Sequence, residues 1–342
     1  MIKKIEYYNL NIKLNNELKL DNNIQLQQHQ HQYFQNQPRS LQDLFDAAHN
    51  LEIMKRAPIF FGDYEHEDYT NAKKNKKKLG DFNTKQLNEA CEFINLYKEN
   101  KEARIITIGD EKIWIYKIKD QIKNEKIEFG KFRQKYYDIE IKKDAKIEDV
   151  PYILATMKTN QAFSRNTFRK IDEKKYEGNI AAIKSLIGEL NDFKIDPLKT
   201  LSSVQLETLI AKIFEKNKAF IPAWRGGTLK DIDIIAEFEK NIPENLFKVK
   251  IQEKKIRIQV KIQLNDKNKL EEIKENLKKN PNFFLITAED GPHKDLKKYH
   301  EENYLTSKWL KKQIYNYDEI KKWYEECIKW LPTQNRKETV FK

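Results

Sequence analysis

Two short segments in the second half of the chain carry polar side chains at a spacing that can support catalysis. Asp231 and Asp233 lie two residues apart, and so do Gln259 and Lys261. In a β-strand, residues i and i+2 point to the same face, so the members of each pair project together. If the two strands are neighbours, a carboxylate, an amide oxygen and an ammonium converge. Such a group can hold a divalent cation, activate a water molecule and neutralise the charge that develops on a phosphorus centre under attack.

The hydrophobic pattern around these residues predicts the elements that position them. An amphipathic helix comes first, followed by two strands, a charged helix that stops before Pro281, and an apolar run typical of a strand buried on both faces. A loop is predicted at 217–229, between the first helix and the first strand, and the segment 304–330 is predicted to be helical. The predicted bounds of the five elements are 202–216, 231–238, 255–263, 266–279 and 283–288.

This order of elements and residues resembles the PD-(D/E)XK nuclease superfamily, specifically its Mrr-like branch, over roughly residues 200–290. Gly226-Gly227 precede the acidic strand, Asp233 fits the motif aspartate, and Gln259-Val260-Lys261 fits the Gln-x-Lys variant of the last motif. Glu207 occupies the position of the family's helical acid. The resemblance implies an α/β restriction-endonuclease-like C-terminal domain with a central mixed sheet. The helix and strand patterns of the preceding part of the chain predict an α+β N-terminal domain.

The motif departs from the family pattern in three respects. No proline precedes the aspartate, the loop after Gly227 is a few residues longer than usual, and Asp231 competes with Asp233 for the metal role. We favour Asp233 because Ile234-Ile235-Ala236 continues from it as a buried strand. Taken singly, each feature is common in a chain this rich in lysine, and Glu207 alone fits a solvated helix. It is the order of the features that favours the nuclease interpretation.

The resemblance also implies a role for each residue of the site. Asp233 binds Mg²⁺, for which Mn²⁺ is a possible substitute, and the side-chain oxygen of Gln259 and the backbone carbonyl near Val260 complete the protein ligands. Lys261 orients or deprotonates the attacking water and stabilises the transition state. Glu207 has a supporting or second-metal role. Two residues beside the glycine pair are expected to hold the scissile strand, Arg225 and Lys230.

The composition favours a polyanionic partner. Among 342 residues, Lys and Arg number 65 against 53 Asp and Glu, a formal net charge of +12. Such a surplus supplies the sequence-independent part of binding to double-stranded DNA, although an AT-rich coding sequence with a merely well-solvated surface has the same composition. The two cysteines lie far apart, which argues against a zinc site and fits a reducing cytoplasm. We find no membrane-spanning run, signal-peptide core or P-loop, so neither a membrane nor an NTP is predicted.

Four segments are predicted along the chain. Residues 1–40 form an N-terminal arm, with weak edge strands at 1–20 and a Gln-rich connector. Residues 41–195 form an α+β DNA-recognition domain, which we weakly compare with EVE/PUA-like base readers. Residues 196–333 form the nuclease domain, and 334–342 form a tail. Within the recognition domain we expect a hairpin at 104–118 and helices at 84–97 and 176–193. Thr84 is the expected N-cap of the helix at 84–97.

Two groups in the N-terminal half carry chemistry suited to nucleic acids. The first group combines amides with two arginines that would share a helical face, and such side chains suit contacts to phosphates and base edges. The alternative interpretation is purely structural: a helix–loop corner buried by Phe163 and Phe168. It comprises Asn160, Gln161, Arg165 and Arg169. The second could line a pocket for a flipped base, although aromatic residues more often build a core. It comprises Trp114, Tyr116, Phe132, Tyr136 and Tyr137.

These features together predict a Mg²⁺-dependent DNA endonuclease of restriction or host-defence type, resembling type II or type IV enzymes. The N-terminal domain would select sequence or base modification. Double-strand cleavage needs two active sites, so a homodimer is expected. Two alternatives stay open: a structure-specific repair nuclease or junction resolvase, and a catalytically inactive DNA-binding protein. RNA also stays open as a substrate.

Overall fold

The computed structural model divides the chain into two compact units, which are described separately. The first comprises residues 1–150 with 154–171, and the second comprises 151–153 with 172–342. This division falls before the boundary predicted near 195–200 and assigns helix α6 (Glu177–Leu186) to the second unit. The structure describes residues 5–10, 49–59, 66–75, 79, 83–126, 133–159, 163, 168–190, 195–224, 231–240, 242–243, 246–247, 253–264 and 266–333.

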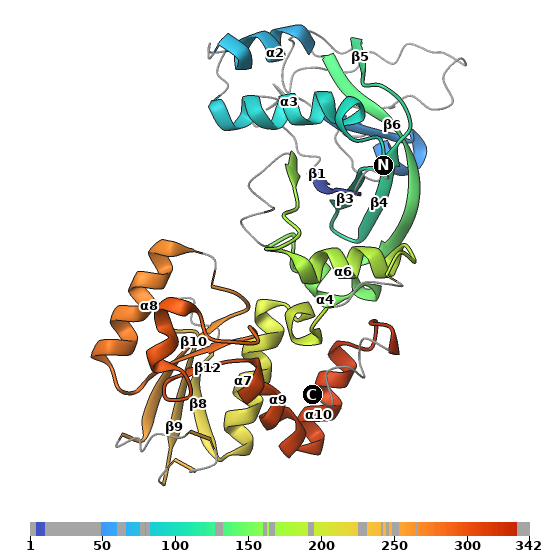
Figure 1. Cartoon of the computed structure of the whole chain (residues 1–342). Helices are drawn as coiled ribbons and strands as arrows, with labels where there is room; N and C mark the ends of the chain where they lie inside the picture. The colour runs from blue at the N-terminus through green and yellow to red at the C-terminus, as the bar shows by residue number, and fades with distance from the viewer. Residues whose placement is uncertain are drawn as a thin grey trace, which may run out of the picture. The chain divides into compact units, whose positions relative to one another are not determined.

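The described part of the first unit is built on a curled mixed sheet in the order β2-β6-β4-β3-β1-β7, with β5 paired to β6 (Figure 1). The predicted hairpin at 104–118 is confirmed as β3 and β4. The prediction of edge strands at 1–20 is wrong for β1, which is parallel to β3 on one side and antiparallel to β7 on the other. Residues 1–4 and 11–20 lie outside the described residues. The strands are β1 Tyr7–Leu10, β2 Arg56–Ile59, β3 Arg104–Ile108, β4 Lys112–Ile118, β5 Lys123–Lys126, β6 Arg133–Lys146 and β7 Phe168–Lys170.

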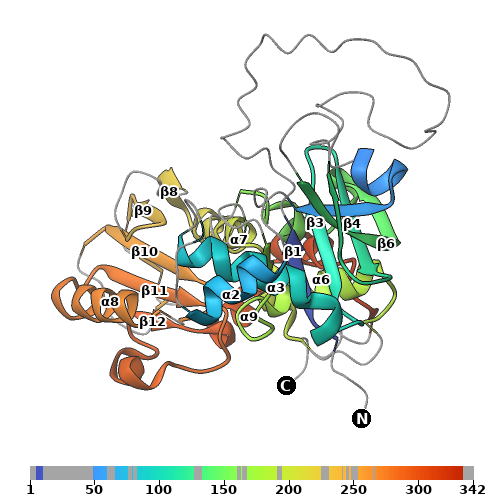
Figure 2. The ribbon, with the colours of Figure 1, turned by 90° about the horizontal axis from the view of Figure 1, so that it is seen from above.

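Two helices lie side by side in this unit, α2 (His66–Asn75) and α3 (Thr84–Glu99) (Figure 2). Helix α3 begins with a capping box in which the Asn83 side chain accepts from the Gln86 N–H, so the N-cap is Asn83 rather than the predicted Thr84. Short helical segments complete the described unit and its junction with the second: η2 His49–Ile53, η3 Ile147–Asp149 and α4 Tyr152–Ala155.

The aromatic residues that could have lined a base-binding pocket belong to the core of this unit. Trp114 is 3% exposed and Tyr137 is fully buried, and the Tyr137 hydroxyl donates to the carbonyls of Phe93 and Ile94 at 2.7 and 2.9 Å. Tyr116 and Tyr136 are equally buried. The core interpretation is therefore confirmed for these four residues, whereas Phe132 lies outside the described residues.

The second unit is an α/β domain with a mixed sheet in the order β12-β11-β10-β9-β8. Strands β8, β9 and β10 are antiparallel neighbours, and β10, β11 and β12 run parallel. The predicted strands at 255–263 and 283–288 are confirmed in position. The strands are β8 Ala219–Trp224, β9 Ile234–Phe238, β10 Lys255–Lys261, β11 Phe283–Thr287 and β12 Tyr304–Leu305.

Helices cover both faces of this sheet (Figure 1). The apolar stripe of α7 (Ser203–Lys216) packs with Ile256, Ile258 and Phe284 on one face. The apolar stripe of α8 (Lys267–Lys279) packs with Phe283 and Leu285 on the other. Both helices were predicted from their periodicity and are confirmed. The remaining helical segments are η4 Pro197–Thr200, η5 Lys294–Tyr299, α9 Ser307–Asn316 and α10 Asp318–Cys327.

The structure corrects two predictions in this unit. Strand β8 occupies residues 219–224 of the predicted loop at 217–229, because an edge strand tolerates Pro222 where a central strand would lose a ladder hydrogen bond. The predicted strand at 231–238 begins only at Ile234, since Asp231 has a left-handed backbone with φ 60°. Within the described residues no helix is both long and apolar enough to cross a lipid bilayer.

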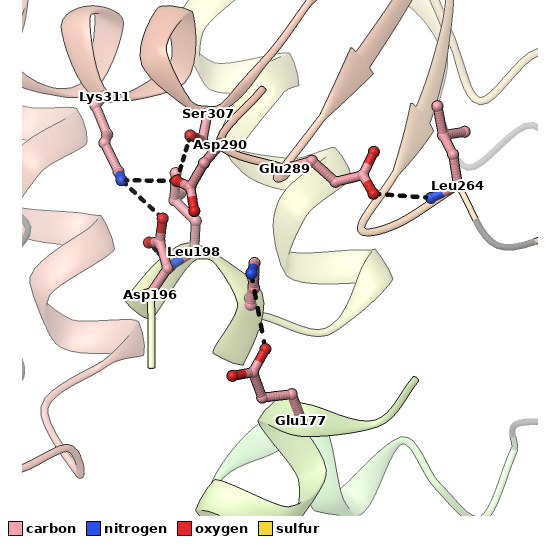
Figure 3. A network of polar contacts seen from close by, with 9 residues as sticks. Glu177, Asp196, Leu198, Leu264, Glu289, Asp290, Ser307 and Lys311 are labelled. Atoms are coloured by element: carbon pink, nitrogen blue, oxygen red, sulfur yellow. Dashed lines mark hydrogen bonds and ion pairs between the residues drawn. The ribbon is translucent and has the colours of Figure 1, made fainter. Parts of the chain in front are cut away.

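A polar network joins the segment before α7 to helix α9 (Figure 3). The Lys311 ammonium lies 2.7 Å from an Asp196 carboxylate oxygen and 3.6 Å from Asp290, and the Ser307 hydroxyl donates to Asp290 at 3.1 Å. Burial raises the pKa of Asp196 despite the neighbouring Lys311. Asp196 also accepts from the Leu198 N–H at 3.0 Å, so it caps η4 and anchors α9 at once.

Candidate functional site

The two segments singled out in the sequence are neighbours in the sheet. Strand β9 pairs antiparallel with β10, with Ile234 opposite Ile258, and Asp233 directly precedes β9. The Asp233 N–H donates to the Ile258 carbonyl at 2.9 Å. Ile256, Ile258 and Val260 face the core under α7. Because side chains alternate along a strand, Gln259 and Lys261 lie on the opposite face of the sheet.

A carboxylate, a backbone amide and an ammonium meet at the end of these two strands. Asp233 Oδ2 accepts from the Val260 N–H at 2.7 Å and from Lys261 Nζ at 3.2 Å. The same Nζ donates to the Val260 carbonyl at 2.9 Å. The side chains of Asp233 and Lys261 are 24% and 26% exposed. Their attraction is therefore screened less than that of a surface ion pair.

Gln259 supplies a buried oxygen that is short of a partner. The residue is only 3% exposed, and its Oε1 has no hydrogen bond within the described part of the chain. Leaving such an acceptor unsatisfied costs about 1–3 kcal/mol. Its partner on the neighbouring strand β11 is Leu285, whose side chain has no hydrogen-bond donor. A buried acceptor without a donor is a feature expected of a residue that binds a cation or a ligand.

The geometry separates the two candidate aspartates. Asp233 contacts Lys261, whereas Asp231 is half-buried with a left-handed backbone, and no hydrogen bond or ion pair joins it to the described residues. Beyond the two contacts at Oδ2, Asp233 Oδ1 makes no hydrogen bond to the described residues. Among the described residues, none therefore occupies Oδ1.

The atoms at this site suit a hard divalent cation. Oxygens of Asp233, Gln259 and Val260 are the type of ligand that Mg²⁺ prefers, and Mg²⁺ keeps several waters and needs few protein ligands. No cluster of three or more His, Cys, Asp and Glu side chains that could hold a metal occurs in the described ranges. The donor set consists instead of one carboxylate, one amide and one backbone carbonyl, and the buried, unsatisfied Gln259 Oε1 fits it.

The other residues singled out in the sequence are not brought to this point by the described structure. Glu207 is half-buried on α7, whose apolar stripe packs on the sheet face opposite to that of Gln259 and Lys261. Arg169 lies in β7 of the first unit, opposite Asn9, so the predicted helical face shared with Arg165 is wrong. The rest fall outside the described residues: Arg225, Lys230, Asn160, Gln161 and Arg165.

Sequence reasoning missed a second acid that follows the neighbouring strand. Lys261 is in register with Thr287 on β11, and the Ala288 N–H donates to the Lys261 carbonyl at 3.2 Å. The next residue, Glu289, accepts from the Leu264 N–H at 3.5 Å, while its Oε2 is buried without a described partner (Figure 3). Burial raises the pKa of this carboxyl. Its only sequence signal is an acid directly after the apolar run 283–288.

No family model matches this chain, and neither a curated protein nor a solved structure matches it.

Proposed function

We propose that this chain is a Mg²⁺-dependent DNA endonuclease of restriction or host-defence type. One observation carries the proposal: Lys261 Nζ lies 3.2 Å from Asp233 Oδ2 where two paired strands meet. Gln259, two residues before Lys261 on the same strand, has a buried and unsatisfied side-chain oxygen. An acid, an amide oxygen and an amine so arranged can bind a metal and activate water.

The arrangement of the second unit supports this reading. Its elements follow the order α7, β8, β9, β10, α8, β11, with three antiparallel strands and then a parallel strand reached through a helix. The resemblance to the PD-(D/E)XK superfamily rests on a helix, an acidic strand, a Gln-x-Lys strand, a helix and an apolar strand in that sequence. The additional edge strand β8 leaves this order intact.

Each residue of the site has a distinct proposed role. The carboxylate of Asp233, the amide oxygen of Gln259 and the carbonyl of Val260 would hold Mg²⁺, which supplies Lewis-acid stabilisation of the attacked phosphate when bound. The ammonium of Lys261 would orient the attacking water and stabilise negative charge in the transition state. The partial burial of Lys261 keeps that charge from being fully screened.

The remaining parts of the proposal concern DNA. The net charge of +12 favours association with a polyanion. The first unit would select the sequence or its modification, and Arg225 and Lys230 would hold the cleaved strand. Cleavage of both strands would require two active sites, hence a homodimer. Because Glu207 lies on α7, which covers the opposite face of the sheet, its proposed role is a supporting one and not that of a ligand in this donor set.

A plasmid assay tests the proposal. The purified full chain would be incubated with Mg²⁺ and either methylated or unmodified plasmid, alongside Lys261→Ala and Lys255→Ala. Lys255 lies on the same strand and pairs with Glu237 on β9, so it is a matched control for the loss of a lysine. Discrete fragments that persist in Lys255→Ala and vanish in Lys261→Ala would support the proposal.

Three other outcomes of the plasmid assay would contradict the proposal. Plasmid that stays intact under all conditions, together with a clear mobility shift, would favour a catalytically inactive DNA-binding protein. Cleavage of a branched junction but not of either plasmid would favour a structure-specific nuclease. Cleavage that is unchanged in Lys261→Ala would reject the site assignment.

A further inference from the structure

The ammonium of Lys261 lies between two oxygens that the proposed function assigns to the metal. Its Nζ donates to Asp233 Oδ2 at 3.2 Å and to the Val260 carbonyl at 2.9 Å. Both acceptors belong to the proposed ligand set. A single positive charge thus already contacts one oxygen of the carboxylate and a carbonyl oxygen, both of which the proposal assigns to the divalent cation.

The surrounding contacts limit the other arrangements of these oxygens. Asp233 Oδ2 is also held by the Val260 N–H at 2.7 Å, so the carboxylate is fixed against the backbone of β10. The Val260 carbonyl is part of the same strand and moves only with the sheet. The flexible member of the group is the four-carbon side chain of Lys261, which is 26% exposed and has solvent to move into.

We infer that the ammonium of Lys261 and a divalent cation exclude each other at Asp233 and Val260, so that the cation binds only when the Lys261 side chain moves away. Two positive charges sharing one carboxylate at this distance repel strongly in a partly buried site. The inference rests on the proposed function, since it concerns the metal site named there. It adds that Lys261 lowers the affinity of its own site for the metal.

The displaced Lys261 ammonium would need a new partner. The released Lys261 must find another anion or water, and a DNA phosphate beside the site is an anion of the right kind. Phosphate and metal would then favour each other's binding, because each stabilises the arrangement that the other requires. Loading of the metal would consequently be coupled to the presence of DNA.

Binding of Mn²⁺ alone, measured by titration calorimetry on the full chain, tests the inference without an activity readout. Lys261→Met removes the charge while keeping an unbranched side chain that is one heavy atom shorter, and Lys255→Met removes the same charge from the same face of the same strand. The two positions are roughly 20 Å apart at about 3.3 Å per residue. Lys255 forms its own ion pair across to β9, with Glu237. We expect Lys261→Met to bind Mn²⁺ at least tenfold more tightly than the wild type, and Lys255→Met to match the wild type.

Asp233→Asn distinguishes failure of this inference from failure of the proposed function. If Asp233→Asn abolishes Mn²⁺ binding while Lys261→Met and wild type bind equally, the metal site stands and the exclusion is wrong. If Asp233→Asn binds Mn²⁺ as the wild type does, or no variant binds it, both ideas fail. Circular dichroism would check folding, and Lys261→Leu replaces Lys261→Met if the latter is misfolded, with the same expected gain.

Discussion

Asp233 Oδ2 accepts the Val260 N–H at 2.7 Å, so a side chain takes the place of a backbone carbonyl where strand β9 begins. The chain enters the sheet from a left-handed Asp231, and the first ladder residue is Ile234. Val260 is 5% exposed, and without Asp233 its amide would lack an acceptor. The residue proposed to bind metal therefore also completes the hydrogen bonding of the sheet.

Two substitutions at Asp233 should separate these roles. Asp233→Ala leaves the Val260 N–H unsatisfied and should lower the free energy of unfolding by about 1–3 kcal/mol, whereas Asp233→Asn keeps an acceptor and should lose less. Both should abolish plasmid cleavage. Urea unfolding followed by the fluorescence of Trp309, Trp323 and Trp330, which pack against the core of the second unit, measures the difference. Equal stability of the two variants would argue against the structural role.

Loss of Lys261 should affect chemistry rather than DNA binding. Lys261→Ala is expected to abolish cleavage because the transition state loses its ammonium, while affinity for DNA stays close to the wild-type value because many other basic residues contribute to it. A cleavage assay beside a mobility-shift titration measures both. Asp231→Ala should reduce cleavage less than Asp233→Ala does. The reverse order would reassign the proposed metal ligand to Asp231.

Burial of Glu289 should make stability depend on pH. Its pKa in the folded protein is raised above the usual 4.5 because burial disfavours the carboxylate. The folded state then holds the proton more tightly than the unfolded state, so its contribution to stability is complete below pH 4.5 and is lost as pH rises through the raised pKa. Glu289→Gln should remove that loss, so the stability of the variant relative to the wild type should increase as pH rises from 4.5 through the raised pKa of Glu289.

Urea unfolding at several pH values tests this expectation. Glu326→Gln is a suitable control, since that side chain is 73% exposed on α10. A pH-independent difference between wild type and Glu289→Gln would contradict the burial argument.

Gly178 marks a close approach of two backbone segments within the second unit. A Cβ at this position in α6 would lie 2.3 Å from the Lys199 carbonyl oxygen and 3.0 Å from Thr200 Cα. Gly178→Ala should therefore lower the free energy of unfolding by about 1–3 kcal/mol through overpacking. Gly291→Ala, with nothing within 4 Å of its new Cβ, should show no loss. Thermal unfolding of both variants compares them, and equal melting temperatures would count against the close packing.

The helices of the second unit could be predicted because their burial follows a helical period. Helix α7 places Leu206, Leu209, Ile210 and Ile213 on one stripe, and the Ser202 capping box marks its start. Strand β8 could not be predicted in the same way. Its Pro222 reads as a breaker, and only the position of the strand at the edge of the sheet makes the proline acceptable.

The candidate site was predictable only in part. Alternation along β10 places Gln259 and Lys261 on one face from the sequence alone. The contact with Asp233 depends on the register between β9 and β10, which are separated by a long connection whose length carries no register information. Glu289 was missed because its contact with Leu264, in the loop after β10, joins residues that are 25 positions apart in the sequence.

The two edges of the second unit's sheet have a consequence for self-association. On one side, β12 is only two residues long. On the other, β8 carries a proline that cannot donate a hydrogen bond and an irregular register between Phe220 and Ala223. Neither described edge offers a long, regular ladder to a strand from a second molecule. A homodimer formed through the described part of the second unit would thus have to associate through helices or loops, and the sheet of this unit would not continue across the interface.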